Sequence, residues 1–259
     1  MRIKPLLVEE RKIKFILEDT NPQFANTLRK VIIGEIPILA IDTVDVYENT
    51  SVLYDEIIAH RLAMIPLVFK PDQFNLKTEC KCDGAGCPLC QTIFVLEKTG
   101  PCTVYSKDIK FDNPDVSVLY PDMPIAELFE GQKLKMEGIA LLGFGKDHAK
   151  WQGGRVYYSY YPAIDVIGKI HDKERLSKIC PKHALSFKED KALVTEDCDL
   201  CGECVKESGN ALKIVSDSTK FIFTVVSVSG LSAQQLVKIA ISTIKEKIKD
   251  FEKSLDKLL

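Results

Sequence analysis

The sequence predicts a mixed α+β fold, with a helix near each end of the chain and mainly strands between them. An amphipathic helical segment follows Asn21-Pro22 close to the amino terminus. Short strand-like runs separated by turn residues occupy residues 92 to 165. A β-branched, aromatic run and then a long amphipathic stretch end the chain. These three observations predict the α+β class.

Composition limits the kind of protein that this chain is. It has 259 residues, of which 46% are hydrophobic and 28% charged, and its net charge is −2. That is an ordinary globular composition, and the length suits one large domain or two to three small ones. A net charge near zero argues against a lone DNA-binding protein. No signal peptide or membrane-length apolar run is visible, so we expect a cytosolic protein.

The first elements expected are a strand and a helix. Apolar and charged residues alternate in most of "RKIKFILED", residues 11–19, which is typical of a strand. Asn21 suits the N-cap of the following helix and Pro22 its first position. Gly34 is expected to end it, because glycine is favoured after a last helical turn. One face of this helix is apolar and comprises Phe24, Leu28, Val31 and Ile32.

A second helix is predicted in "YDEIIAHRLAMIP", residues 54–66. It carries Glu56 and His60 four positions apart. We interpret them as an exposed pair on one helix face, because a di-metal carboxylate site needs a spacing of three and a second copy. Strands are expected afterwards in "TIFVLEK", "CTVYSKDIKF" and "GGRVYYSYYP".

The carboxyl-terminal elements are a buried strand and a long helix. "KFIFTVVSVSG" carries apolar residues on both faces, as a buried strand does. Ser232 is the expected N-cap of the helix. An apolar stripe with alternating spacings of four and three then comprises Ile244, Ile248, Phe251, Leu255 and Leu258. About two heptads are too few for a coiled coil, so the stripe predicts packing on a core or on a partner.

Nine cysteines point to metal ligation, because disulfides are rare in a reducing compartment. Cys102 stands alone and is expected to be a small buried apolar residue. The other eight fall into two groups of four. The first group is Cys80, Cys82, Cys87 and Cys90. The second group is Cys180, Cys198, Cys201 and Cys204.

The second group resembles the ligand set of a ferredoxin. Residues 198–204 have the spacing C-x2-C-x2-C, but Ser208 stands where the fourth cysteine of that motif would follow. In two-cluster ferredoxins the fourth ligand of each cluster is a Cys-Pro from the other half of the domain. Cys180-Pro181, 18 positions before Cys198, supplies such a residue. We therefore predict one iron–sulfur cluster, either [3Fe–4S] or [4Fe–4S], rather than zinc. Three cysteines suffice for the former.

The first group places four thiols within eleven residues, in "CKCDGAGCPLC". Gly84 and Gly86 allow the chain to fold back on itself, so that the four sulfur atoms meet. This arrangement is plausible for a tetrahedral zinc ion. Disulfide formation is the alternative, since some intracellular proteins of hyperthermophiles contain disulfides.

Residues 24–67, "FANTLRKVIIGEIPILAIDTVDVYENTSVLYDEIIAHRLAMIPL", resemble a known family, and "GFGKDHAKW" at 143–151 resembles a second stretch of it. The sequence is similar to the α-type assembly subunits of multisubunit RNA polymerases. It most resembles the archaeal D-type subunit, which is related to the third-largest eukaryotic subunit. Several unrelated short motifs of this family occur here in the same order as in the family. The likeness runs over about residues 10 to 67, resumes near 137 to 165 and closes with the terminal strand and helix.

The resemblance implies a discontinuous fold of three parts. Residues 1–43 and 217–259 would form a dimerisation domain from the two chain ends. Residues 44–165 would form an inserted, mainly β domain, and residues 166–216 an inserted ferredoxin-like domain with the cluster, as in some archaeal D-type chains. The loop at residues 80–90 resembles the zinc loop of the eukaryotic relatives, although the spacing between Cys82 and Cys87 is only similar.

The resemblance also implies a function. Such subunits are not catalytic. They pair with a small α-like subunit, L, and the pair nucleates assembly of the two large catalytic subunits, with subunits N and P joining. No catalytic set is evident in the sequence, which agrees with that role. The alternative is an electron-transfer subunit of an oxidoreductase, but the sequence shows no flavin or nucleotide motif. The predicted partner interface comprises Phe24, Leu28, Ile32, Ile244, Ile248, Phe251 and Leu255.

Overall fold

The computed structural model describes residues 1–189 and 191–258 and has a mixed α and β fold. The chain divides into two compact units. Unit 1 comprises residues 1–9, 13–29 and 156–225, and unit 2 comprises residues 10–12, 30–155 and 226–258. This division is coarser than the three parts predicted above, which stay a prediction. Among the described residues, no helix combines the length and the apolar character needed to cross a membrane.

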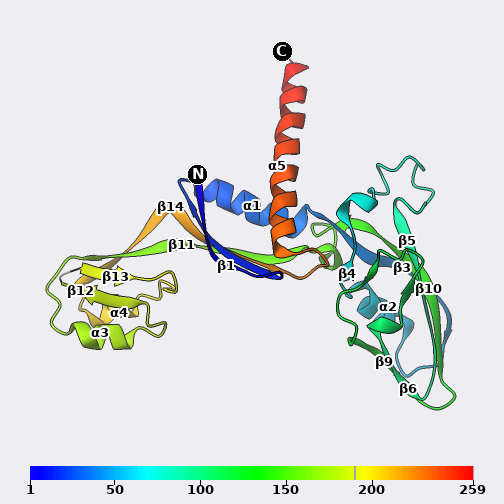
Figure 1. Cartoon of the computed structure of the whole chain (residues 1–259). Coiled ribbons are helices and arrows are strands. Elements are labelled where there is room, and N and C mark those ends of the chain that lie inside the picture. Colours follow the sequence, from blue (N-terminus) through cyan, green and yellow to red (C-terminus); the bar gives the residue numbers. More distant parts are fainter. Residues whose placement is uncertain (190, 259) are drawn as a thin grey trace. The chain divides into compact units, whose positions relative to one another are not determined.

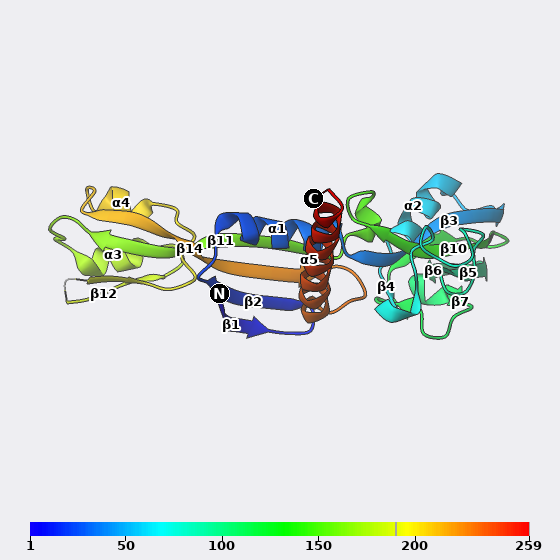
Figure 2. The same cartoon turned by 90° about the horizontal axis from the view of Figure 1, so that it is seen from above.

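Four strands form the sheet that lies mainly in unit 1, in the order β1-β2-β14-β11. They are β1 (Arg2–Val8), β2 (Lys12–Glu18), β14 (Leu212–Ser227) and β11 (Gly154–Val166). Figure 2 shows them side by side. β1 and β2 are antiparallel neighbours. β14 is the last strand of the chain, yet it lies between β2 and β11. The strands predicted in residues 11–19, 154 onward and 220 onward are therefore confirmed.

Aromatic residues form much of the core of this sheet. Phe15 and Phe223 stack with ring centroids 5.4 Å apart. Tyr158 of β11 stacks on Phe223 and meets Phe221 edge-on, at centroid distances of 5.8 and 5.5 Å. Such pairs add to the free energy already gained by burying their surface. The aromatic residues of the last predicted strand thus hold its neighbours in place.

Both β11 and β14 continue into a small region that holds the second cysteine group (Figure 1). That region adds helices α3 (Lys173–Ile179) and α4 (Glu203–Glu207). It also adds a hairpin of β12 (Leu185–Lys188) and β13 (Lys191–Val194). Ile164 of β11 and Leu212 of β14 are buried in its core. The region is therefore built on two strands of the larger sheet.

Helix α1 (Pro22–Gly34) begins where the capping residues predict. The Asn21 side-chain oxygen accepts a hydrogen bond of 2.8 Å from the amide of Phe24. This bond satisfies one of the free amides of the first turn, which is the role of an N-cap. Leu28 and Ile32 are buried, with 3% and 0% of their surface exposed. The predicted helix and its apolar face are confirmed.

Unit 2 is centred on a sheet in the order β3-β10-β5-β7. The strands are β3 (Pro37–Asn49), β10 (Lys133–Phe144), β5 (Gln91–Thr99) and β7 (Lys110–Phe111). β10 is antiparallel to both β3 and β5. β5 shows the alternation of a half-buried strand, because Phe94 and Leu96 are buried whereas Ile93 and Val95 are exposed.

Shorter elements complete unit 2. Helix α2 (Asp55–Ala63) confirms the second predicted helix, and Glu56 and His60 on it are exposed. β4 (Leu67–Val68) pairs with β8 (Ser117–Val118), and β6 (Cys102–Tyr105) pairs with β9 (Pro124–Leu128). Single 3-10 turns are η1 (Pro71–Gln73), η2 (Ser106–Asp108) and η3 (Ala149–Trp151). Cys102 begins β6 and is half-buried, so the expectation that it is a buried residue was wrong.

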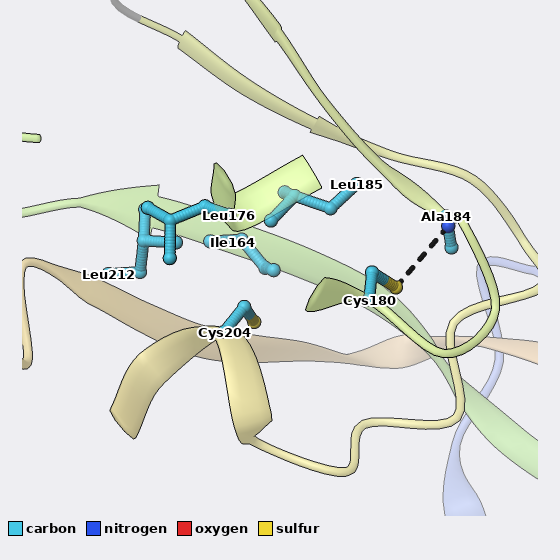
Figure 3. Packing of buried hydrophobic residues seen from close by; sticks show 7 residues of the cluster. All are labelled: Ile164, Leu176, Cys180, Ala184, Leu185, Cys204 and Leu212. Carbon is cyan, nitrogen blue, oxygen red and sulfur yellow. Dashed lines mark hydrogen bonds between the residues drawn. The ribbon is translucent and has the colours of Figure 1, made fainter. Parts of the chain in front are cut away.

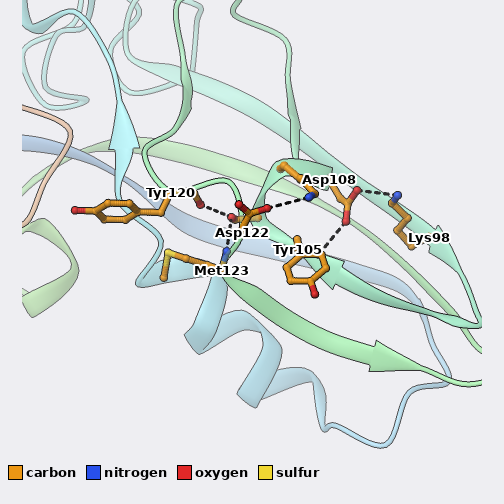
Figure 4. A network of polar contacts seen from close by, with 8 residues as sticks. Lys98, Tyr105, Asp108, Tyr120, Asp122 and Met123 are labelled. Atoms are coloured by element: carbon orange, nitrogen blue, oxygen red, sulfur yellow. Dashed lines mark hydrogen bonds and ion pairs between the residues drawn. The ribbon is translucent and has the colours of Figure 1, made fainter.

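A polar network fixes the turn after β6 (Figure 4). Asp108 accepts a hydrogen bond of 2.8 Å from the amide of Tyr105 and pairs with Lys98 at 2.7 Å. Burial raises the pKa of Asp108, but the Lys98 ammonium and the Tyr105 amide outweigh it and hold this pKa below its ordinary value. Lys107 pairs with Asp122 at 2.9 Å. The turn is therefore held by a bond to its own backbone and by two ion pairs with side chains of the same unit.

The last helix, α5 (Ala233–Asp256), starts at the predicted cap. Ser232 and Gln235 form a reciprocal capping box. The turn before it is held by Arg11, whose guanidinium donates to the carbonyl oxygens of Ser227 and Ser229 at 3.2 and 2.6 Å. The buried residues of α5 lie in its first turns and are Ala233, Leu236 and Ala240.

Candidate functional site

The first cysteine group lies in the loop that leads into β5, within unit 2. The four sulfur atoms of Cys80, Cys82, Cys87 and Cys90 all lie within 4.8 Å of one another. The Sγ atoms of Cys80 and Cys87 are 3.5 Å apart, and those of Cys82 and Cys90 are 3.6 Å apart. Cys80 and Cys90 are buried. The sequence-predicted group is thus brought together by the fold.

Backbone turns in the left-handed region make this closure possible. Asp83, Gly84 and Gly86 have φ values of 50°, 80° and 91°. Residues in this region reverse the chain within a few positions, and glycine does so without steric cost. The amide of Cys87 also donates to the sulfur of Cys90 at 3.3 Å. The glycines predicted to fold the loop back therefore do so.

The thiols of this group differ in acidity. A hydrogen bond from the Gly86 amide and one from the Cys80 thiol lower the pKa of Cys82 to about 6. Burial raises the pKa of Cys90 to about 12. A positive ion bound between the sulfur atoms would stabilise all four thiolates, because thiolates are the form that ligates metal. Without a bound ion, hydrogen bonds favour the thiolate of Cys82, whereas burial disfavours the thiolate of Cys90.

The sulfur spacing fits one tetrahedral metal ion. A zinc–sulfur bond of about 2.3 Å places tetrahedral sulfur atoms about 3.8 Å apart. The distances of 3.5, 3.6 and 3.9 Å between neighbouring sulfur atoms match that value. A disulfide bond is only about 2.05 Å long, and all nine cysteines are free thiols. In this structure the group therefore fits a zinc site and contains no disulfide.

The second cysteine group is arranged differently, within unit 1. Its four residues line one narrow hollow, together with Ile164, Leu185 and Ile214. Among the described residues, the only group of three or more ligand atoms that all lie within 4.8 Å of one another is the Cys80 group. The second group is therefore wider than a single zinc ion requires. A cluster places several iron and sulfide atoms between its thiolates, so it needs such a wider ring.

Apolar packing surrounds this hollow (Figure 3). Cys180 and Cys204 are each 9% exposed and belong to a cluster with Leu176, Leu185 and Leu212. The Cys180 sulfur accepts a hydrogen bond of 3.3 Å from the amide of Ala184. Amide bonds to the ligating sulfur atoms are one of the features that tune a cluster. Four thiols around an apolar hollow, with a backbone amide aimed at one of them, fit an iron–sulfur cluster.

The predicted partner residues fall into two sets. Leu28 and Ile32 are covered by the chain's own atoms, and Phe24 is half-buried. Along α5 the apolar stripe is mostly uncovered, because Ile248, Phe251 and Leu255 are 54%, 68% and 44% exposed. Ile244 is half-buried. The role of these residues as a partner interface stays a prediction.

Sequence reasoning missed one exposed member of the stripe. Ile241, one turn before Ile244, is 37% exposed. Extending the predicted stripe by one more spacing of three residues, back from Ile244, would have included it. In Figure 1 the second half of α5 extends away from the other elements of its own unit. Ile241 therefore begins the uncovered part of the stripe.

Comparison with known proteins decides the family. A chain named DNA-directed RNA polymerase subunit Rpo3 from Pyrococcus horikoshii is 40% identical over 100% of this chain and 99% of its own length. The chain belongs to the Rpo3 family. The Archaeoglobus fulgidus Rpo3 is 38% identical over 97% of both chains, and that of Methanosarcina acetivorans is 37% identical over 100% and 99%. The family described as RNA polymerase Rpb3/RpoA insert domain matches residues 39–156.

Family membership agrees with the resemblance in residues 24–67, and it leaves the metal sites open. The matched residues 39–156 contain the Cys80 group, whereas the second cysteine group lies beyond them. The names of these relatives mention no metal. The case for zinc and for an iron–sulfur cluster therefore comes from the sulfur geometry of this chain.

Proposed function

We propose that this chain is a non-catalytic assembly subunit of a DNA-dependent RNA polymerase. Its relatives are named as subunits of that enzyme. It pairs with the small α-like subunit L, and the pair supports assembly of the two large catalytic subunits and of subunits N and P. The observation that carries the proposal is the uncovered stripe of α5, because a large exposed apolar surface on a soluble protein marks an interface.

Both cysteine groups have structural roles in this proposal. The second group, Cys180 with the three cysteines of residues 198–204, holds one iron–sulfur cluster, which is supported by its wider sulfur spacing and its apolar surroundings. The Cys80 group holds one zinc ion, which is supported by its sulfur spacing. The alternative of an electron-transfer subunit has no support in the comparisons, whose relatives are polymerase subunits over nearly their full length.

The pairing is tested with one substitution on each face of α5. Phe251→Asp places a carboxylate in the apolar stripe, and Ser242→Asp places one on the opposite face, where Ser242 is exposed. Loss of a central apolar anchor costs about 2 kcal/mol or more, which weakens binding roughly 30-fold. Co-expression with the small α-like subunit, co-purification and mass measurement of the complex should give a 1:1 pair for the wild type and for Ser242→Asp.

Phe251→Asp should strongly reduce co-purification and leave the bound metals unchanged, because α5 contains no cysteine. A wild-type chain that remains a monodisperse monomer of 29.1 kDa beside its partner would defeat the proposal. Equal loss of pairing in both variants would show that the apolar stripe is not the contact surface.

A further inference from the structure

The sheet β1-β2-β14-β11 has two edge strands, β1 and β11. Within residues 1–189 and 191–258, no further strand of the chain pairs with the outer side of either one. An edge strand presents a row of unpaired amides and carbonyl oxygens, which bind readily to another extended chain. Native proteins therefore protect such edges, and the two edges of this sheet differ in how they are protected.

The β1 edge carries several features that disfavour an added strand. Arg2 and Lys4 are exposed and charged. Pro5 has no amide hydrogen to donate, and the register of β1 against β2 shifts between Pro5 and Leu7. Charges, proline and local irregularities are the devices by which proteins keep an edge strand from pairing with another chain. β1 is therefore a protected edge.

The β11 edge has neither charges nor proline over residues 156–161, "VYYSYY". Tyr157 is 58% exposed and Tyr160 36%, and Ser159 between them is also exposed. Tyrosine and valine favour extended backbone. A neutral segment of this composition pairs readily with other strands. The first residue that would stop such pairing is Pro162.

The aromatic core holds this edge in an extended form. The rings of Tyr158 and Tyr160 lie 5.5 and 5.2 Å from that of Phe221 in β14. The ammonium of Lys220 lies 3.9 Å from the centroid of the Tyr161 ring and pairs with Glu18 at 2.9 Å, so its charge is already matched. The edge therefore offers a preformed row of hydrogen-bonding groups and aromatic surface, without an unmatched charge for a partner to neutralise.

We propose that an extended, uncharged segment of another polymerase subunit adds to β11 as a fifth strand of this sheet. The inference rests on the proposed function. Only an extended backbone matches a strand edge, because a helix already uses its own amides and carbonyl oxygens. About six residues would pair with residues 156–161, and apolar or aromatic side chains of that segment would pack beside Tyr157 and Tyr160.

The test compares the free full-length chain with whole polymerase purified through a tag on this chain. Amide hydrogen exchange is resolved to single residues by fragmentation in the mass spectrometer. In the free chain every second amide of residues 156–161 should exchange fast, because it points away from β14. In the polymerase these amides should slow roughly tenfold or more. The outward amides of β1 are the internal control and should stay fast in both samples.

Two variants of one exposed residue sharpen the test. Ser159→Lys places a charge on the edge, as β1 does with Lys4, and should remove most of the added protection of β11. Ser159→Thr stays neutral and β-branched and should keep it. Equal protection of β11 in the two variants would show that this edge is not the contact.

Three further outcomes are decisive. A polymerase in which β11 is protected no more than β1 overturns this inference and leaves the proposed function standing. Protection that rises with the concentration of the free chain alone would identify a second copy as the occupant and also overturns it. A chain that does not enter the polymerase defeats both the inference and the proposed function.

Discussion

Each of the two cysteine groups offers four sulfur atoms as ligands, but the two groups arrange these atoms differently. In the Cys80 group the sulfur atoms touch one another, at 3.5 to 3.9 Å, and they come from one loop of eleven residues. In the second group they are more widely spaced, line a narrow hollow and come from two segments 18 residues apart. The first site closes a loop. In the second, the cysteines are part of the core itself.

This difference predicts how much of the fold is destabilised when each metal is lost. The Cys80 loop joins a sheet that has its own core, which contains Phe94 and Leu96 of β5. The second region has only a small core, and two of its seven buried members are Cys180 and Cys204. A small core without its metal rarely holds a fold, because it buries too little apolar surface to offset chain entropy. We therefore expect a local effect at the first site and a regional one at the second.

The largest effect is expected from Cys204→Ala. This change removes an inner ligand and part of the apolar core, so bound iron should fall to near zero while zinc is retained. Amide hydrogen exchange should rise throughout α3, β12 and β13, because these elements pack around the same hollow. Cys102→Ala is the matched control, since Cys102 belongs to neither group. Unchanged exchange in α3 would mean that the region folds without its cluster.

A smaller and more local effect is expected from Cys90→Ala. The bound zinc should be lost and the iron retained, because the two groups share no ligand. Exchange should rise in residues 71–90, while β10 stays protected by its pairing with β3. Metal content and mass-resolved exchange measure both results. Simultaneous loss of iron would break the comparison, because it would couple two sites that share no ligand.

The smallest effect is expected from one glycine in each site. Gly86 and Gly202 have φ values of 91° and 80°, so alanine at either position costs about 1 kcal/mol in backbone strain. An added Cβ at Gly86 would also lie 2.6 Å from Oε1 of Gln91, whereas at Gly202 it meets nothing closer than 4.0 Å. Competition with a chelator should show weaker zinc binding in Gly86→Ala and unchanged zinc binding in Gly202→Ala. Equal zinc affinities in the two variants would show that the Cys80 loop tolerates the strain.

Local signals in the sequence predicted much of the fold. Asn21 and Ser232 mark helix starts because their side chains bond to amides a few residues away, and that information is contained in the sequence. The Cys80 group was found for the same reason, since its four thiols lie within eleven residues. Such features depend on neighbours along the chain, which a sequence pattern records directly.

Long-range features were not predictable in the same way. Leu28 of α1 and Phe251 of α5 both lie on apolar helix faces, yet the first is 3% exposed and the second 68%. Burial depends on which distant elements cover a face, and periodicity does not record that. The exposure of Cys201 was not predictable for the same reason, because the pattern C-x2-C-x2-C does not distinguish the burial of its three cysteines.

The position of β14 has a consequence for synthesis on the ribosome. The strands of the β3-β10-β5-β7 sheet are all complete once residue 144 has emerged, so that sheet is free to form early. The other sheet has to wait, because β2 and β11 are joined by β14, whose last residue is Ser227. Strands β1 and β2 are among the first residues made, and their neighbour arrives almost last. Until then the edge of β2 that pairs with β14 stays open, and an open strand edge exposed during synthesis favours aggregation.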